Sequence, residues 1–189
     1  MSQKVVLVYE GNEYKVQLNG VDICTEKDMD KAYEAFKVTI KNNTSNQDVD
    51  WETIKNEMLN SGVTSVNIND EYKNISLGNI KYFYHSDKAF YTGEGTMTAL
   101  IGGRQFLGRV VELVAKGLLT DYNALGALCI KVIEEKANYS LAEGYLTITS
   151  AAFSYGKVVY DFERGKMDKG TTSEKTSFEV FSEYVSQML

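Results

Sequence analysis

The stretch Ser65–Tyr91, SVNINDEYKNISLGNIKYFYHSDKAFY, decides the fold class of this 189-residue chain. Apolar and polar residues alternate along it in short runs, and residues that favour turns separate these runs. Turns are predicted at Asn69-Asp70, Gly78-Asn79 and Ser86-Asp87. Because such short turns connect neighbouring antiparallel strands, we predict a four-stranded antiparallel meander here.

The segments on either side of the meander continue the same organisation. One hairpin is predicted over Val5–Leu18 around Gly11-Asn12, and another over Tyr145–Phe162 around Gly156-Lys157. About five helices are predicted where apolar residues recur at helical spacing. They start at a Thr25/Asp28 capping box, after Asp50, near Leu107, after Thr120 (ending near Asn138) and near Phe178.

The predicted order of elements is ββ-αα-ββββ-αα-ββ-α, in which strands come as hairpins and do not alternate singly with helices. This order favours an α+β fold with antiparallel sheets over a parallel α/β fold. No linker-like composition divides the chain, so residues 1–189 are predicted to form a single α+β domain, with Asn42–Asp48 as the alternative boundary. The charged stretch Arg164–Thr172 is predicted to be a mobile loop.

Composition narrows the classes of partner. The net charge of −6 argues against direct binding of nucleic acid, which needs Lys and Arg to displace counterions from phosphates. It also argues against docking on anionic membranes. No apolar segment approaches the ~20 residues that a membrane span needs, and the sequence starts without a secretion signal. We therefore expect a cytoplasmic protein without membrane contact.

The residues that usually carry catalysis or bind metals are scarce. Cys24 and Cys129 are the only cysteines and His85 is the only histidine, which provides neither a disulfide framework nor a zinc site. His85 falls at the end of a predicted strand beside a turn, where an imidazole is simply solvated. No Gly-x-Ser-x-Gly motif supplies a serine nucleophile. We predict no catalytic residue, no metal and no cofactor.

Acidic residues gather around the first two predicted helices. Carboxylates in first turns suit the helix dipole, and this structural role accounts for several of them. The alternative is a contiguous negative face that imitates nucleic-acid phosphates toward a basic partner. The predicted partner-binding residues are Asp28, Asp30, Glu34, Asp48, Asp50, Glu52 and Glu57.

The segment Gly93–Arg109 has the features of an anion site. Glycines let backbone amides approach an anion, a helix N-terminus offers free N–H groups, and arginine can hold phosphate with two hydrogen bonds. Neither a P-loop nor the dinucleotide fingerprint is complete, and close packing where a sheet passes into a helix is the favoured explanation of the glycines. The candidate ligand-binding residues are Gly93, Gly95, Thr96, Gly102, Gly103, Arg104 and Arg109.

These observations favour binding over catalysis. The leading hypothesis is a non-enzymatic cytoplasmic protein-binding module. Its concrete form is a small acidic inhibitor, of the type that phages and mobile elements use against host defence, which occupies a basic surface of a nuclease or other host protein. The alternatives are a nucleotide- or phosphate-binding protein that uses Gly93–Arg109, and a structural subunit of a homo-oligomer such as a virion component.

Overall fold

A computed structural model of the chain describes residues 4–43, 49–93 and 95–189, and of residues 40–43 it describes the backbone alone. Within these residues it contains five α-helices and three antiparallel sheets, which confirms the predicted α+β class. Contacts divide the chain into two compact units, residues 1–49 (unit 1) and residues 50–189 (unit 2). The division falls beside the alternative boundary at 42–48, of which 44–48 lie outside the described residues. Folding as a single domain stays a prediction.

Unit 1 is a three-stranded sheet with one helix packed against it. It consists of β1 (Val5–Glu10), β2 (Glu13–Leu18), β3 (Val21–Glu26) and α1 (Met29–Asn43), with the strands in the order β1-β2-β3. The predicted hairpin is confirmed, and Gly11 and Asn12 both have the positive φ that a tight two-residue turn requires. Val16 on the middle strand and Ala32 on α1 are fully buried. They form the centre of this small core.

The start of α1 differs from the prediction. Thr25 lies in β3, a strand that the sequence pattern did not indicate, and so it does not cap the helix. The cap is Asp28, whose Oδ1 accepts the backbone N–H of Asp30 at 2.9 Å and that of Lys31 at 3.2 Å. An aspartate directly before the first helical residue reaches these free amides. Thr25 instead pairs with Lys15 of β2 in the sheet.

The first sheet of unit 2 contains the predicted meander and a fifth strand. Its strands are β4 (Val66–Asn69), β5 (Asn74–Leu77), β6 (Ile80–Phe83), β7 (Lys88–Tyr91) and β8 (Thr98–Leu100). They lie in chain order, each antiparallel to the next, and the short 3₁₀ turn Tyr84–Ser86 (η2) joins β6 to β7. Ile75, Ile80 and Tyr82 are fully buried on one face. Because side chains alternate along a strand, their neighbours form a second, outer face.

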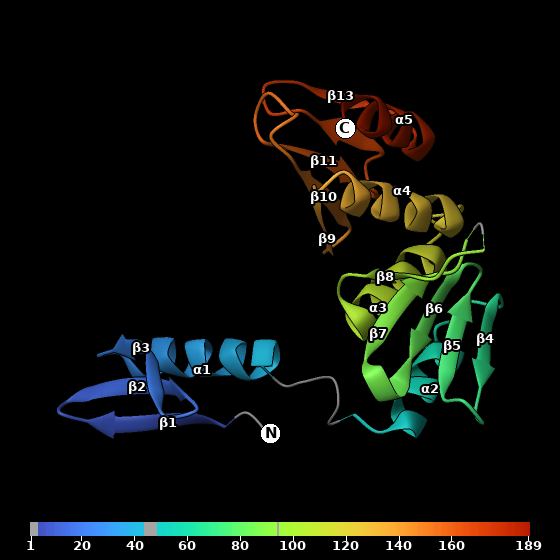
Figure 1. Cartoon of the computed structure of the whole chain (residues 1–189). Coiled ribbons are helices and arrows are strands. Elements are labelled where there is room, and N and C mark those ends of the chain that lie inside the picture. The colour runs from blue at the N-terminus through green and yellow to red at the C-terminus, as the bar shows by residue number, and fades with distance from the viewer. Residues whose placement is uncertain (1–3, 44–48, 94) are drawn as a thin grey trace. The chain divides into compact units, whose positions relative to one another are not determined.

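Three helices cover the inner face of this sheet. They are α2 (Trp51–Asn60), α3 (Gly103–Ala115) and α4 (Tyr122–Glu134). Contacts run from α2 to β4, from α3 to β6 and β7, and from α4 to β6, β7 and β8. In Figure 1 α2 and α3 lie behind the sheet and its outer face is toward the viewer.

The ends of these helices test the predicted caps. Asp50 caps α2 as predicted, since its carboxylate accepts the N–H of Thr53 at 2.9 Å. The cap of α4 is Asp121 and not Thr120, and the helix ends at Glu134. Asn138, predicted as the end of that helix, instead begins the next strand. The first error arises because neighbouring polar residues offer almost equal caps and packing selects between them. The helix ends earlier than predicted because Lys136 has a positive φ of 58° and Asn138 pairs with Thr149 in the next sheet.

The second sheet of unit 2 has five strands where a hairpin was predicted. They are β9 (Asn138–Ala142), β10 (Tyr145–Thr149), β11 (Lys157–Asp161), β12 (Lys166–Asp168) and β13 (Ser173–Lys175), in the order β13-β12-β11-β10-β9. The predicted hairpin corresponds to β10 and β11. Arg164–Thr172, predicted to be a mobile loop, contains β12, which pairs with strands on both sides. Tyr139 of β9 joins this sheet to the first one, because its hydroxyl contacts both the N–H and the C=O of Ile101.

The C-terminal helix α5 (Phe178–Met188) docks on the second sheet and on α4. Tyr160 of β11 places its ring 5.0 Å from that of Phe181 and 5.5 Å from that of Phe178. Phe162 adds a further ring, 5.0 Å from Tyr160. Phe181 is fully buried at the centre of this cluster. The apolar stripe predicted for the helix therefore packs on the body of the same chain.

The aromatic cluster predicts a large effect of shortening Phe181. We expect Phe181→Ala to lower the free energy of unfolding by about 3–5 kcal/mol, because it leaves a cavity among rings that hold α5 to β11. The measurement is urea unfolding followed by circular dichroism. Val180→Ala is the control, since Val180 is 51% exposed and its loss should change stability by no more than about 0.5 kcal/mol. Equal effects of the two changes would contradict this account.

Candidate functional site

The seven predicted acidic residues divide between the two units. Asp28, Asp30 and Glu34 belong to unit 1, at the start and along the length of α1. Asp50, Glu52 and Glu57 belong to unit 2, at the cap of α2 and within it. Asp48 lies outside the described residues. Because these residues do not share one unit, a single contiguous acidic face stays a prediction.

Most of these carboxylates have a local structural partner. Asp28 and Asp50 accept backbone N–H groups as helix caps. The hydrogen bonds from Thr53 lower the pKa of Asp50, because they stabilise its charged form. Glu52 pairs with Lys55 at 3.2 Å. The structural role predicted for first-turn acids therefore applies to α2.

Glu57 connects the two sites that the sequence suggested separately. Its Oε2 lies 2.6 Å from Nη2 of Arg104, although the two residues are 47 positions apart. The side chain of Arg104 is only 18% exposed. Arg109 in turn pairs with Glu112 of its own helix at 3.0 Å. Both arginines predicted to hold a phosphate thus hold carboxylates of the chain.

The N-terminus of α3 also has an anion in place. Oδ1 of Asp87, which follows η2, lies 3.4 Å from the backbone N of Arg104 and accepts the hydroxyl of Tyr82 at 3.0 Å. Burial, followed by the neighbouring Asp87 carboxylate, raises the pKa of Tyr82, so the phenol stays protonated and donates. The anion that this segment binds in the structure is therefore a side chain of the protein. Binding of a separate ligand here stays a prediction.

The glycines of the segment have different surroundings. A Cβ on Gly103, whose φ is +49°, would lie 2.2 Å from the carbonyl oxygen of Asp87. A Cβ on Gly93 would meet the ring of Tyr91 at 2.3 Å, whereas Gly95 faces open space. Thr96 closes a turn on Gly93 through its N–H and its hydroxyl, both at 2.9 Å. Close packing of α3 against Asp87 accounts for Gly103, and the ring of Tyr91 accounts for Gly93.

The surroundings of Gly103 and Gly108, two glycines of α3, predict that replacement by alanine changes the free energy of unfolding very differently at the two positions. We expect Gly103→Ala to cost about 2–4 kcal/mol of unfolding free energy, from the left-handed backbone and from the clash with Asp87. Gly108→Ala is the control, because nothing lies within 4 Å of its added Cβ and alanine favours a helix by up to about 1 kcal/mol. Urea unfolding of both variants measures this. Similar stabilities would show that Gly103 is not a packing constraint.

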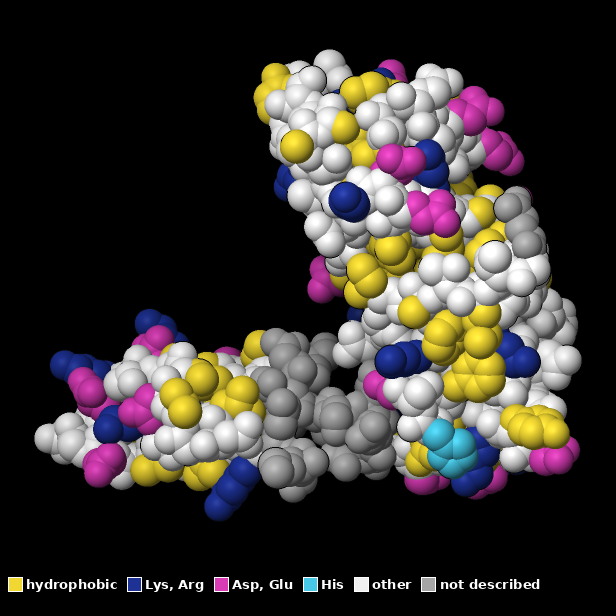
Figure 2. Space-filling model, in the orientation of Figure 1, with side chains coloured by type: hydrophobic (Ala, Val, Ile, Leu, Met, Phe, Trp, Pro, Cys, Tyr) yellow, Lys and Arg dark blue, Asp and Glu magenta, His cyan; other side chains and the backbone are white. Residues whose placement is uncertain are grey.

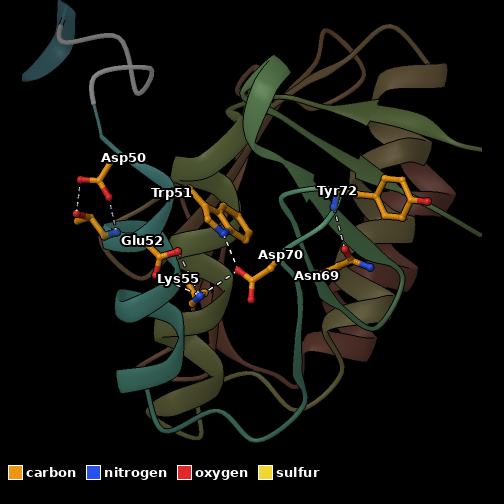
Figure 3. Close-up of polar contacts among 8 residues, drawn as sticks. Asp50, Trp51, Glu52, Lys55, Asn69, Asp70 and Tyr72 are labelled. Atoms are coloured by element: carbon orange, nitrogen blue, oxygen red, sulfur yellow. Dashed lines mark hydrogen bonds and ion pairs between the residues drawn. The ribbon is translucent and has the colours of Figure 1, made fainter.

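A polar cluster that the sequence analysis missed fixes α2 to the first sheet (Figure 3). Trp51 donates its indole N–H to Oδ1 of Asp70 at 2.8 Å, and Nζ of Lys55 lies 3.0 Å from the same oxygen. The ring of Tyr84 meets Trp51 edge-on at 5.9 Å. A buried indole N–H needs an acceptor, so the sequence implied a partner for Trp51 but did not identify it as Asp70 in a turn 19 positions away.

The same cluster borders a shallow hollow of about 460 Å³, lined also by Glu52 and Lys73. Lys55 faces both Glu52 and Asp70, and the ammonium of Lys73 lies over the ring of Tyr84 at 5.6 Å. Because the lysine and the two carboxylates satisfy one another, the arrangement acts as an attachment between α2 and the β4–β5 turn. It contains no group that is prepared for acid–base chemistry.

This attachment predicts a dependence of stability on acidity. The indole N–H of Trp51, followed by Lys55, lowers the pKa of Asp70. Its contribution is therefore fully present above the ordinary aspartate pKa of about 3.9 and is lost as the pH falls through the lowered value. We expect the urea midpoint of the native chain to fall more between about pH 5 and pH 2.5 than that of Asp70→Asn.

Trp51 is the only tryptophan, so its fluorescence reports on this cluster directly. Glu71→Gln is the matched control, since it removes one charge from an exposed position in the same turn. Its pH dependence should follow that of the native chain. If Asp70→Asn kept the full pH dependence, the Trp51–Asp70 hydrogen bond would not be the cause.

The other side chains that could take part in chemistry, His85 and Cys129, lie apart from each other in the sequence. His85 is exposed on η2, beside the ring of Tyr84 at 5.5 Å. Burial raises the pKa of the Cys129 thiol, which keeps it protonated and unreactive. In the part of the chain that the structure describes, no three His, Cys, Asp or Glu side chains gather to hold a metal ion. The absence of a catalytic residue stays a prediction.

No helix among the described residues combines the length and the hydrophobicity that crossing a membrane requires. Comparison of the chain with protein-family models, curated proteins and solved structures finds no match in any of the three.

Proposed function

We propose that the chain is a non-enzymatic protein-binding module, and that its partner docks on the outer half of α1 in unit 1. The observation that carries this proposal is the exposure of large apolar side chains on that half of the helix. Met29 is 59% exposed, Tyr33 49% and Val38 53%. Scattered apolar residues are normal on a surface, but these three lie along one helix together with acidic residues.

The positions follow from the helical repeat. Ala32 and Thr39 are buried on the side of α1 that faces the sheet. Met29 and Tyr33 are four residues apart and so lie one above the other on one flank of the helix, beside the buried side. Asp30, Glu34 and Val38 form the adjoining row by the same spacing. We call Met29, Asp30, Tyr33, Glu34 and Val38 the α1 surface, and Figure 2 shows hydrophobic and acidic side chains intermingled on this unit.

The chemistry of the α1 surface favours a basic partner. A tyrosine beside another exposed apolar side chain, as Tyr33 is beside Met29, is a frequent source of binding energy, because it buries much area with little loss of conformational freedom. Asp30 and Glu34 add negative charge, which attracts lysine and arginine and accelerates association. Glu34 pairs with Lys37, whose ammonium also lies 5.1 Å from the centre of the Tyr33 ring, so the row stays negative through Asp30. In its concrete form the module is an inhibitor that occupies a basic surface of a nuclease or other host protein.

The test compares two variants of the full chain. Tyr33→Ala removes the central ring, and Asp30→Lys/Glu34→Lys reverses the charge beside it. The tagged chain is used to capture its partner from cell extract, the partner is identified by mass spectrometry, and the dissociation constant is then measured with both proteins purified. We expect each variant to weaken binding at least tenfold, and rising salt to weaken the native complex more than the Asp30→Lys/Glu34→Lys complex, because salt screens the charges that this variant reverses.

The control is Glu52→Lys on α2, which reverses the charge of an exposed carboxylate of unit 2. Its affinity should remain within about threefold of the native value. A partner that binds all variants equally would contradict docking on α1. Native mass spectra of the purified chain are recorded in parallel. A stable homo-oligomer that is lost in the Tyr33→Ala variant would show that the α1 surface binds a second copy of the chain and not a foreign partner.

A further inference from the structure

The outer face of the first sheet of unit 2 remains open, because α2, α3 and α4 all cover the opposite face. The strand register places its side chains in two rows across the sheet. One row runs Asn67, Ser76, Lys81, Phe90, Ala99, and the other runs Asn69, Asn74, Phe83, Lys88. None of these nine residues is acidic, in a chain whose net charge is −6.

Two aromatic rings and two ammonium groups alternate at the centre of this face. Lys81 is directly opposite Phe90, and Phe83 is directly opposite Lys88. The rings of Phe83 and Phe90 meet edge-on with their centroids 5.6 Å apart, and Nζ of Lys81 lies 5.4 Å from the centre of the Phe83 ring. We call these four residues the Phe–Lys face. In Figure 2 it corresponds to a hydrophobic patch over the front of the sheet with basic side chains on both sides.

The positive charge of this face is free to act on a ligand. All three arginines of the chain pair with carboxylates, at Glu57, Glu112 and Asp161. Neither Lys81 nor Lys88 has an ion-pair partner within the described ranges. Ala99, the neighbour of Phe90 on β8, is small and exposed.

We propose that the Phe–Lys face binds single-stranded nucleic acid. Unpaired bases stack on aromatic rings that project from an open sheet, and lysines beside the rings neutralise the phosphates that connect these bases. Half-exposed phenylalanine rings satisfy the first requirement and the two free ammonium groups satisfy the second. A duplex, whose bases are already stacked on each other, cannot use the rings.

This inference goes beyond the proposed protein-binding function and concerns the other unit. It also limits what the net charge of −6 implies. Overall acidity argues against binding of nucleic acid when the charge is spread evenly, but phosphates respond to the charge within about one Debye length, which is ~8–10 Å at physiological salt. The strand residues of the sheet carry two positive charges and no negative one, and the carboxylate of Asp87, directly before Lys88, accepts hydrogen bonds from the Tyr82 hydroxyl and the Arg104 backbone N–H.

Fluorescence anisotropy of the full chain with labelled 20-nucleotide oligothymidylate and oligouridylate tests the proposal, with a 20-base-pair duplex of mixed sequence for comparison. At about 50 mM salt we expect either single strand to bind more tightly than the duplex. Lys81→Gln/Lys88→Gln should weaken binding at least tenfold. It should also reduce the slope of log affinity against log salt by about 1.4, because each lysine releases about 0.7 counterion from a single strand.

Phe90→Leu separates stacking from charge. It keeps an apolar side chain on the strand but removes the ring, so affinity should fall about 5- to 100-fold with an unchanged salt slope. The matched control is Lys166→Gln/Lys175→Gln, a directly opposed pair of lysines on β12 and β13, which should change affinity by less than about threefold.

Three results would overturn the proposal: no binding of either single strand at about 50 mM salt, equal loss from the two double-lysine variants, or equal affinity for the duplex. A homodimer seen by native mass spectrometry and lost in Lys81→Gln/Lys88→Gln would also overturn it, since the Phe–Lys face would then bind a second copy of the chain and not nucleic acid.

Discussion

The carboxylate of Asp87 determines how the first sheet of unit 2 meets its helices. It lies at the end of η2, where the backbone has a positive φ of 47°, and it faces both the Tyr82 hydroxyl and the N-terminal amide of Arg104. A negative charge at the start of a helix is stabilised by the free N–H groups and by the dipole. Gly103 then has to be a glycine, because the carbonyl of Asp87 occupies the space of a side chain. These contacts anchor α3 on one face of the sheet and leave the other face open.

The pairing of charges follows from the same packing. Once α3 is anchored, Arg104 reaches Glu57 on α2, and the Trp51–Asp70 hydrogen bond joins α2 to the β4–β5 turn. On the inner side of the sheet, Arg104 and the carboxylates of Glu57 and Asp70 are therefore engaged in contacts within the chain. Lys81 and Lys88 project from the other side, where no carboxylate of the strands is present. An acidic protein thus acquires a local surface of the opposite sign, and overall charge is a poor guide to the chemistry of one face.

Elements whose signals involve only adjacent residues could be predicted from the sequence, and elements that depend on distant residues could not. The hairpins at Gly11-Asn12 and Gly78-Asn79 were predicted correctly, because a two-residue turn and the alternation beside it involve only adjacent residues. Strands of three residues, such as β8, β12 and β13, show almost no alternation. Pairing with a neighbouring strand creates them, and no property of their own sequence indicates it. The caps Asp28 and Asp121 were displaced by one to three positions in the prediction for a related reason, since several polar residues nearby can accept the same amides.

The amino-acid sequence by itself determined that the chain is an antiparallel α+β protein in which Asp50 starts a helix and a meander follows it. These features rest on spacing and turn chemistry, which act over a few residues. The tertiary structure alone decided which charges remain free. Arg104 meets a carboxylate 47 residues away, Asp87 fills the helix end that resembled a ligand site, and the four residues of the Phe–Lys face assemble from two strands. Electrostatic and packing interactions depend on distance in space, and that distance exists only after the sheets and helices have packed.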